Sequence, residues 1–214
     1  MITVWGRKTS SNVQAVLWCL DELGLAFERI DAGHTYGGLD TPAYLEMNPH
    51  GRIPTLIDGD NPPLWESGAI IRYLASRYGG ESFWPSDAVA RAEIDKWAEW
   101  AKLNFAGTFT VNVFWKVVRT ATSKRNWEEI RAAISRVEDE LAIADTKLAS
   151  SEFLAGADLS VADIQFGHCL YRYYDISIER RPLANLERYY QTLTSRPAYA
   201  NRVMVSYEAL RVDD

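Results

Sequence analysis

The chain has few cysteines and no long apolar run, and each shortage excludes a class of protein. Only two of its 214 residues are cysteines, Cys19 and Cys169, and they form no C-x-x-C pair. We therefore expect no disulfide framework and a reducing compartment, the cytoplasm. No apolar run reaches the roughly 18 residues that a membrane-spanning helix needs, so no membrane partner is expected. No N-x-[ST] glycosylation site occurs either, which agrees with that compartment.

Basic stripes and the common catalytic signatures are also missing. Acidic residues outnumber Lys and Arg by 29 to 23 and give a formal net charge of −6, so nucleic acid is not expected as a partner. His34, His50 and His168 have no metal-ligand spacing, and we expect no metal. There is no G-x-S-x-G, no P-loop and no G-x-G-x-x-G, so nothing predicts a serine hydrolase or a nucleotide-binding site of those types.

Aromatic residues are abundant, and the first part of the chain alternates between strand and helix patterns. Eight Trp and eleven Tyr favour aromatic-lined packing and an aromatic-lined pocket. Short β-type runs at 2–5 and 27–30 flank a helical pattern that ends at Gly24. A strand, a helix and a strand in that space predict one βαβ unit with parallel strands.

Residues 41–80 predict a helix, a β-hairpin and a second helix. Thr41-Pro42 is a typical helix start, with a hydroxyl cap and proline at the first position. The run Asp58-Gly59-Asp60-Asn61 is a hairpin turn signal between two short strands. Ser67 is predicted to cap the next helix, which ends at Gly79-Gly80. This order of elements predicts a thioredoxin-like α/β domain over residues 1–80.

After a linker at 81–87, residues 88–214 show only helical periodicity and predict an all-helical second domain. Asn126 with Glu129 three residues later predicts one helix start. Ser160-Val161-Ala162-Asp163 resembles a capping box in which Asp replaces the usual Glu or Gln. His168 lies among apolar residues and is predicted to be a core side chain. The same interpretation, a small buried hydrophobe, applies to both cysteines.

The most informative stretch is residues 48–68. It contains Asn48-Pro49-His50-Gly51-Arg52-Ile53-Pro54-Thr55-Leu56 and, after a turn, Leu64-Trp65-Glu66-Ser67. Pro54 stands directly before a β-type run, which favours a cis peptide bond. These two segments match N-P-x-G-[KR]-[IV]-P-x-L and [LW]-x-E-S, and the chain therefore resembles the soluble, serine-type glutathione transferases. Both predicted domains match that family's plan.

The resemblance implies that glutathione is a co-substrate whose thiol is activated at the start of the first helix. Tyr and Cys are absent from the loop before that helix, as in the serine types. Ser10-x-x-x-Gln14-Ala15-Val16 resembles their S-x-x-x-[RQ]-x-V pattern and implies that Ser10 donates to the sulfur. Ser11 takes that role if the alignment shifts by one residue, and Asn12 orients the sulfur or caps the helix. Without the resemblance, both serines would be interpreted simply as helix caps.

The charged ends and the backbone of glutathione need binding partners, and the resemblance assigns these to particular residues. Glu66 would accept from the γ-glutamyl ammonium, and Ser67 would hold the neighbouring carboxylate at a helix start. The backbone of Ile53 would pair with the cysteinyl segment, with Pro54 keeping that edge strand open. The candidates for the glycine carboxylate are His34, Lys8, Arg7 and Arg52.

The second substrate is expected to bind where the helical domain faces Ser10. Phe105, Phe109, Phe114 and Trp115 are the candidate wall of an apolar electrophile pocket, with Trp100 and Tyr171 as further candidates. Packing in the core is the alternative for each of these side chains.

The function that this resemblance implies is a glutathione S-transferase with a detoxification role. It would conjugate the glutathione thiolate to small apolar electrophiles and act as a homodimer through the surface near Arg72, Arg77 and Trp97. One alternative is a glutathione-dependent disulfide or peroxide reductase. Another is a binding module that has kept the fold and lost catalysis.

Overall fold

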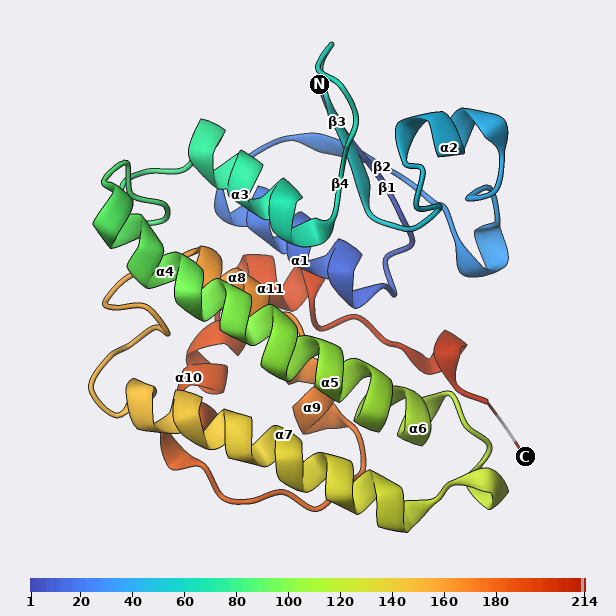
Figure 1. The fold of residues 1–214 in the computed structure, drawn as a ribbon, viewed down its shortest axis with the longest axis vertical. Coiled ribbons are helices and arrows are strands. Elements are labelled where there is room, and N and C mark those ends of the chain that lie inside the picture. The colour runs from blue at the N-terminus through green and yellow to red at the C-terminus, as the bar shows by residue number, and fades with distance from the viewer. Residues whose placement is uncertain (213) are drawn as a thin grey trace.

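The computed structural model describes residues 1–212 and 214, and it places a small sheet above a larger set of helices (Figure 1). The strand order is β2-β1-β3-β4. Strand β1 (Ile2–Trp5) pairs in parallel with β2 (Phe27–Ile30) and antiparallel with β3 (Thr55–Asp58), which continues into a hairpin with β4 (Leu64–Trp65). The predicted βαβ unit followed by a hairpin is therefore confirmed.

Three helices belong to this sheet half. Helices α1 (Ser11–Glu22) and α3 (Ser67–Tyr78) pack together between the sheet and the helical half, while α2 (Pro42–Met47) lies at the outer edge (Figure 1). A short 3₁₀ turn spans His34–Tyr36. As predicted, the Thr41 side chain accepts from the backbone N–H of Tyr44 and caps α2.

The start of α3 and the place of Pro54 differ from the sequence predictions. The N-cap is Glu66, with φ of 69°, and Ser67 is the first helical residue. The prediction that Ser67 caps this helix was wrong, because the sharp turn after β4 falls one residue earlier. The Ile53–Pro54 bond is cis as predicted. However, the strand after it, β3, lies inside the sheet, so Pro54 does not keep an edge strand open.

The second half is helical, and no strand follows β4 in the residues that the structure describes. Its longest feature runs from α4 to α6 as one nearly continuous helix, with two stretches of π-helix (Figure 1). The elements of this half are α4 (Ala88–Trp100), π-helix Ala101–Ala106, α5 (Gly107–Phe109), π-helix Thr110–Phe114, α6 (Trp115–Val118), a 3₁₀ turn Thr122–Lys124, α7 (Trp127–Leu148), α8 (Val161–Gly167), α9 (Leu170–Asp175), α10 (Ala184–Thr194), α11 (Pro197–Arg202) and a 3₁₀ turn Glu208–Leu210.

Both predicted helix starts in this half are confirmed. Asn126 accepts from the backbone N–H groups of Glu128 and Glu129 at the start of α7. At α8, the buried Asp163 carboxylate accepts from the backbone N–H of Ser160 at 2.9 Å and from its hydroxyl at 3.1 Å. It also accepts from the Leu154 N–H, so Asp163 ties the preceding loop to the helix.

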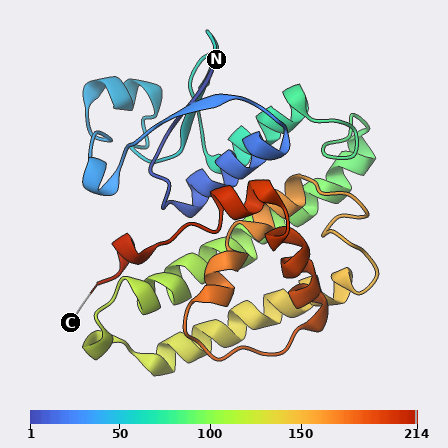
Figure 2. The same ribbon diagram turned by 180° about the vertical axis from the view of Figure 1, so that it is seen from behind.

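Helix α11, near the end of the chain, packs against α1, near its beginning. Figure 2 shows the red α11 beside the blue α1. The rings of Trp18 and Tyr199 meet edge to face with centroids 4.9 Å apart. On either side, Arg196 pairs with Glu22 at 2.6 Å and Arg202 pairs with Asp21 at 2.6 Å. These contacts hold the sheet half and the helical half together.

Candidate active site

A cleft of about 500 Å³ lies between the two halves. The sheet half contributes the start of α1 and the segments around residues 33–39 and 52–53, and the helical half contributes α8 and the run from Lys102 to Trp115. The predicted site residues on its walls are Arg7, Ser11, Asn12, His34, Arg52, Ile53 and Trp115.

Ser10 directly precedes these wall residues and is the N-cap of α1 by position, although it does not itself line the cleft. Its backbone is extended, with φ of −88° and ψ of 124°. Its hydroxyl makes no capping hydrogen bond within the described part of the chain. The interpretation of Ser10 as a side-chain cap is therefore wrong, and its hydroxyl remains available to a ligand.

Glu66 and Ser67 connect the start of α3 to this cleft. The Ser67 hydroxyl donates to Asn12 Oδ1 at 3.4 Å. The exposed Glu66 carboxylate lies 3.4 Å from Lys102 Nζ. Since Asn12 and Lys102 both line the cleft, the helix start lies beside it with an acceptor, a hydroxyl and free backbone N–H groups.

The prediction that Phe105, Phe109 and Phe114 line an electrophile pocket was wrong. All three are fully buried, and none lines the cleft. Phe109 packs against the other two with ring centroids 5.7 and 6.2 Å apart. Trp115 follows Phe114 and therefore points about 100° around the helix; it is 42% exposed and does line the cleft.

Two cleft residues, one on α8 and one directly after it, were not predicted as site residues. His168 is buried, and its Nδ1 lies 3.2 Å from the carbonyl of Ile164. Burial lowers the pKa of His168 to about 4, so the ring is neutral at pH 7, as expected of a core side chain. Gln165 is only 1% exposed, and its amide nitrogen has no hydrogen-bond partner in the described residues.

Arg172 on α9 fixes the loop that leads into α1. The guanidinium donates to the carbonyl of Thr9 at 2.7 Å and to Gln14 Oε1 at 3.3 Å. It also lies over the ring of Phe114, with Cζ 4.6 Å from the centroid. Burial lowers the pKa of Arg172 to about 10, so the side chain is still charged at neutral pH.

The thiols and acids that the structure describes do not form a further reactive centre. Cys19 and Cys169 are buried as predicted, and burial raises the pKa of both thiols, that of Cys169 to about 11. Among the described residues, no group of three His, Cys, Asp or Glu side chains is arranged to hold a metal ion. In the same part of the chain no helix is both long enough and apolar enough to cross a membrane.

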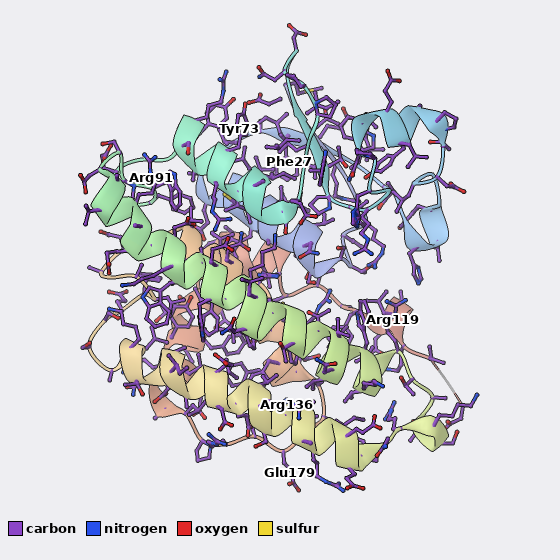
Figure 3. All side chains as sticks on the ribbon, viewed as in Figure 1. Phe27, Tyr73, Arg91, Arg119, Arg136 and Glu179 are labelled. Carbon is purple, nitrogen blue, oxygen red and sulfur yellow. The ribbon has the colours of Figure 1, made fainter. Side chains whose placement is uncertain are left out.

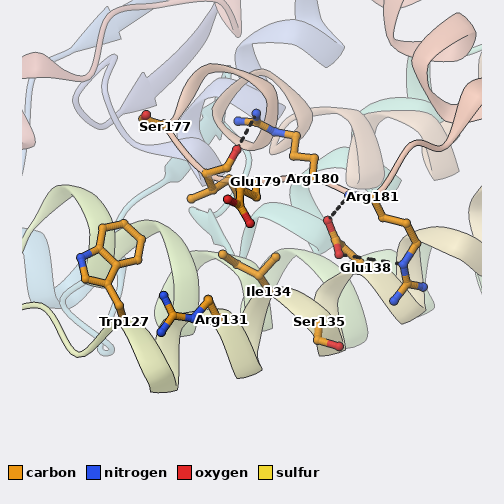
Figure 4. Close-up of a pocket in the computed structure, with 10 residues that line it drawn as sticks. Trp127, Arg131, Ile134, Ser135, Glu138, Ser177, Glu179, Arg180 and Arg181 are labelled. Carbon is orange, nitrogen blue, oxygen red and sulfur yellow. Dashed lines mark hydrogen bonds and ion pairs between the residues drawn. The ribbon is translucent and has the colours of Figure 1, made fainter.

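A second cavity, of about 640 Å³, lies between α7 and the segment 177–181 (Figure 4). Its polar groups hold that segment in place. Glu138 accepts from the backbone N–H of Arg181 at 2.7 Å, and Arg180 Nε donates to the carbonyl of Tyr173 at 2.8 Å. None of the predicted site residues lies there, so the cleft remains the candidate active site.

Two family descriptions match the chain. Residues 5–82 match the glutathione S-transferase N-terminal domain, and residues 110–197 match the glutathione S-transferase C-terminal domain.

Individual relatives resemble nearly the whole chain. It is 37% identical to glutathione S-transferase GstB of Escherichia coli K12, covering 96% of this chain and 99% of that protein. Glutathione S-transferase 3 of Zea mays is 30% identical over 94% of this chain and 93% of its own. The crystal structure of a theta class glutathione S-transferase from Xanthomonas axonopodis pv. citri with glutathione bound has a TM-score of 0.90 at 43% identity, covering 96% of this chain and 98% of that one.

Proposed function

The chain belongs to the glutathione S-transferase family, and from this premise we propose that its cleft binds glutathione beside the start of α1 and transfers it to an electrophile. The protein is thus a glutathione transferase. The observation that carries the proposal is the cleft itself, which brings Ser11, Asn12, Arg52 and Ile53 of the sheet half opposite Trp115 of the helical half. A two-substrate reaction needs such a shared space.

The γ-glutamyl end of glutathione would bind at the start of α3. The Glu66 carboxylate would accept from the ammonium, replacing its weak contact with Lys102. Ser67 and the first N–H groups of α3 would hold the carboxylate. The backbone of Ile53 would pair with the cysteinyl segment, and His34 and Arg52, which also line the cleft, would take the glycine carboxylate.

Ser10 would stabilise the sulfur anion. A free thiol has a pKa near 8.5, and each unit of lowering needs about 1.4 kcal/mol. A hydroxyl donor at the N-terminus of α1 supplies part of this through a charge-assisted hydrogen bond and the helix dipole. The thiolate then forms a carbon–sulfur bond, the leaving group departs with the electrons of the broken bond, and the thiol proton passes to solvent.

The electrophile would be a small molecule with an apolar body lying against Trp115, Val111 and Ala106, which line the helical wall. We further propose a detoxification role in the cytoplasm. The domain limits would be 1–80 and 88–214, joined by residues 81–87.

The active form would be a homodimer. The dimer interface would run along α3 and α4 near Arg77 and Trp97. Arg72, also expected there, is engaged within the chain by Asp95 and Glu99, so it would contribute less than the sequence predicted. The oligomeric state can be measured by light scattering on the purified chain.

Calorimetric titration with glutathione, followed by conjugation of 1-chloro-2,4-dinitrobenzene, tests the function. We expect saturable heat and glutathione-dependent turnover. Absence of heat at millimolar glutathione would refute the proposal and favour a module that has kept the fold and lost catalysis. Binding without conjugation, together with disulfide or peroxide reduction, would favour the reductase alternative.

A further inference from the structure

Three arginines form a cluster of positive charge beside the cleft: Arg7 lines it, Arg119 lies over its wall residue Trp115, and Arg172 donates to the carbonyl of Thr9. Arg7 comes from the loop before α1, Arg119 follows α6, and Arg172 lies on α9. Burial and then the charge of Arg119 lower the pKa of Arg7, and burial lowers the pKa of Arg172, to which the charge of Arg7 adds. Arg7 therefore lies within electrostatic range of both Arg119 and Arg172.

No carboxylate neutralises this cluster. Elsewhere in this acid-rich chain arginines pair with acids, as Arg196 does with Glu22 at 2.6 Å. In the described part of the chain, none of the three clustered arginines forms a salt bridge, and no Asp or Glu lines the cleft. An oxyanion from outside the chain would remove part of this repulsion.

Two donors in the cluster are also unused. Nε of Arg7 and Nε of Arg172 are both buried, and neither has a hydrogen-bond partner among the described residues. Buried polar groups are normally satisfied, and leaving one unpaired is costly. Arg7 lines the cleft, its Nε is enclosed by protein, and its Nη1 already donates to Thr9 Oγ1 at 2.8 Å, so Nη2 is the group that a ligand oxygen would engage.

An apolar surface lies next to these charges. The guanidinium of Arg119 lies over the ring of Trp115, with Cζ 5.2 Å from the centroid. Figure 3 places Arg119 at the end of the long helix, on its side toward the sheet half. Trp115 is itself a partly exposed wall of the cleft. A ligand resting on this indole would thus have a cation within reach.

We propose that the preferred electrophile carries a carboxylate beside its apolar body. This inference rests on the proposed transferase function. Arg7 and Arg119 bind the carboxylate, the apolar body lies against Trp115, and Arg172 is a positioning residue that acts through Thr9. In the reaction with a chloroarene, the glutathione sulfur bonds to the ring carbon and chloride leaves with the electron pair. The carboxylate itself is unchanged.

A pair of electrophiles that differ in one substituent tests the proposal, with each kcat/KM divided by the rate constant of the uncatalysed reaction with glutathione. The carboxylate is 4-chloro-3,5-dinitrobenzoate, and its neutral match is the corresponding carboxamide. We expect the wild-type protein to favour the carboxylate, and the ratio of the two kcat/KM values to fall about tenfold or more in Arg7→Gln and Arg119→Gln, because a charge-assisted bond is lost. Arg136→Gln, on the exposed side of α7 (Figure 3), is the matched control and should leave the ratio unchanged.

The outcomes separate this inference from its alternatives. An equal loss for both electrophiles, with a raised KM for glutathione, would assign Arg7 to the glycine carboxylate of glutathione and overturn the proposal. A wild-type ratio near one would overturn it as well, whereas failure to conjugate either compound would refute the transferase function instead.

Binding of an inert analogue provides a readout that does not need turnover. The chlorine-free 3,5-dinitrobenzoate and 3,5-dinitrobenzamide can be titrated against the glutathione-saturated protein by tryptophan fluorescence. We expect the benzoate to bind more tightly, with its advantage lost in Arg119→Gln and kept in Arg136→Gln. Equal affinity for the two analogues in the wild-type protein would refute the carboxylate site even if the enzyme proves active.

Discussion

The guanidinium of Arg172 donates to the carbonyl of Thr9 at 2.7 Å and so joins α9 directly to the residue before Ser10. Replacement of Arg172 by Met would leave this carbonyl and the Gln14 side chain without their donor. We expect a loss of about 2 kcal/mol in the free energy of unfolding, the usual cost of an unsatisfied buried group. Urea unfolding measures this, with Arg136→Met as the surface control. Because the loop also loosens, kcat should fall; wild-type stability and kcat together would disprove the positioning role.

Replacement of Ser10 by Ala should reduce turnover about tenfold or more, since one charge-assisted hydrogen bond to the thiolate is lost. The fold should survive because this hydroxyl makes no capping hydrogen bond in the described residues. Ultraviolet difference spectra should show a raised pKa of bound glutathione. Ser11→Ala is the matched control, and a larger loss in that variant would move the catalytic role to Ser11.

Replacement of Glu66 by Gln should weaken glutathione binding. The exposed carboxylate would lose its attraction for the γ-glutamyl ammonium, while Lys102 would lose its acidic neighbour. We expect KM for glutathione to rise about tenfold with a smaller change in kcat, because this end of glutathione is remote from the sulfur. Steady-state kinetics measure both constants. Glu93→Gln on the exposed face of α4 is the control, and an unchanged KM for Glu66→Gln would remove Glu66 from the site.

His168 should make the protein less stable in mild acid. Its pKa is lowered from 6.5 to about 4 in the folded state, first by burial. Between these values the unfolded chain binds a proton that the folded chain does not, so stability falls as the pH drops below 6.5. The contribution at pH 5 is a loss of about 2 kcal/mol. Comparison of urea unfolding at pH 7.5 and 5 should show a shallower pH dependence in His168→Gln. Equal pH dependence in the two proteins would show that folding does not lower the pKa of His168.

Asp163 should be among the most sensitive positions in the helical half. Its carboxylate is fully buried and accepts from Ser160, Leu154 and the Tyr189 hydroxyl. Asp163→Ala would leave these donors unpaired, and we expect a loss of about 3 kcal/mol or more in the free energy of unfolding. Asp158→Ala, an exposed acid in the preceding loop, provides the comparison. Similar losses in the two variants would contradict the role of Asp163 in holding the preceding loop against α8.

Local chemistry explains why much of the fold was predictable. Thr41, Asn126 and Asp163 each act within a few residues of their own position, as helix caps do. The start of α3 was misplaced by one residue because the backbone of Glu66, with φ of 69°, is set by the turn after β4 and not by the identity of Ser67.

The candidate site was less predictable because packing assembles it from distant segments. The run from α4 to α6 has apolar residues on two faces, and periodicity did not distinguish the buried Phe109 from the cleft residue Trp115. Arg172 and Thr9 are far apart in the sequence, so no spacing rule joins them. Gln165 reaches the cleft because α8 packs against α1, α3 and α4.

The contact between Trp18 and Tyr199 has a consequence for how the chain is made. During synthesis on the ribosome, the first helix emerges long before the segment that covers its indole ring. The nascent sheet half therefore exposes an aromatic side chain that is fully buried at the end. Emergence of α11 would complete this packing, and chains truncated before Arg196 should bind chaperones rather than accumulate as free protein.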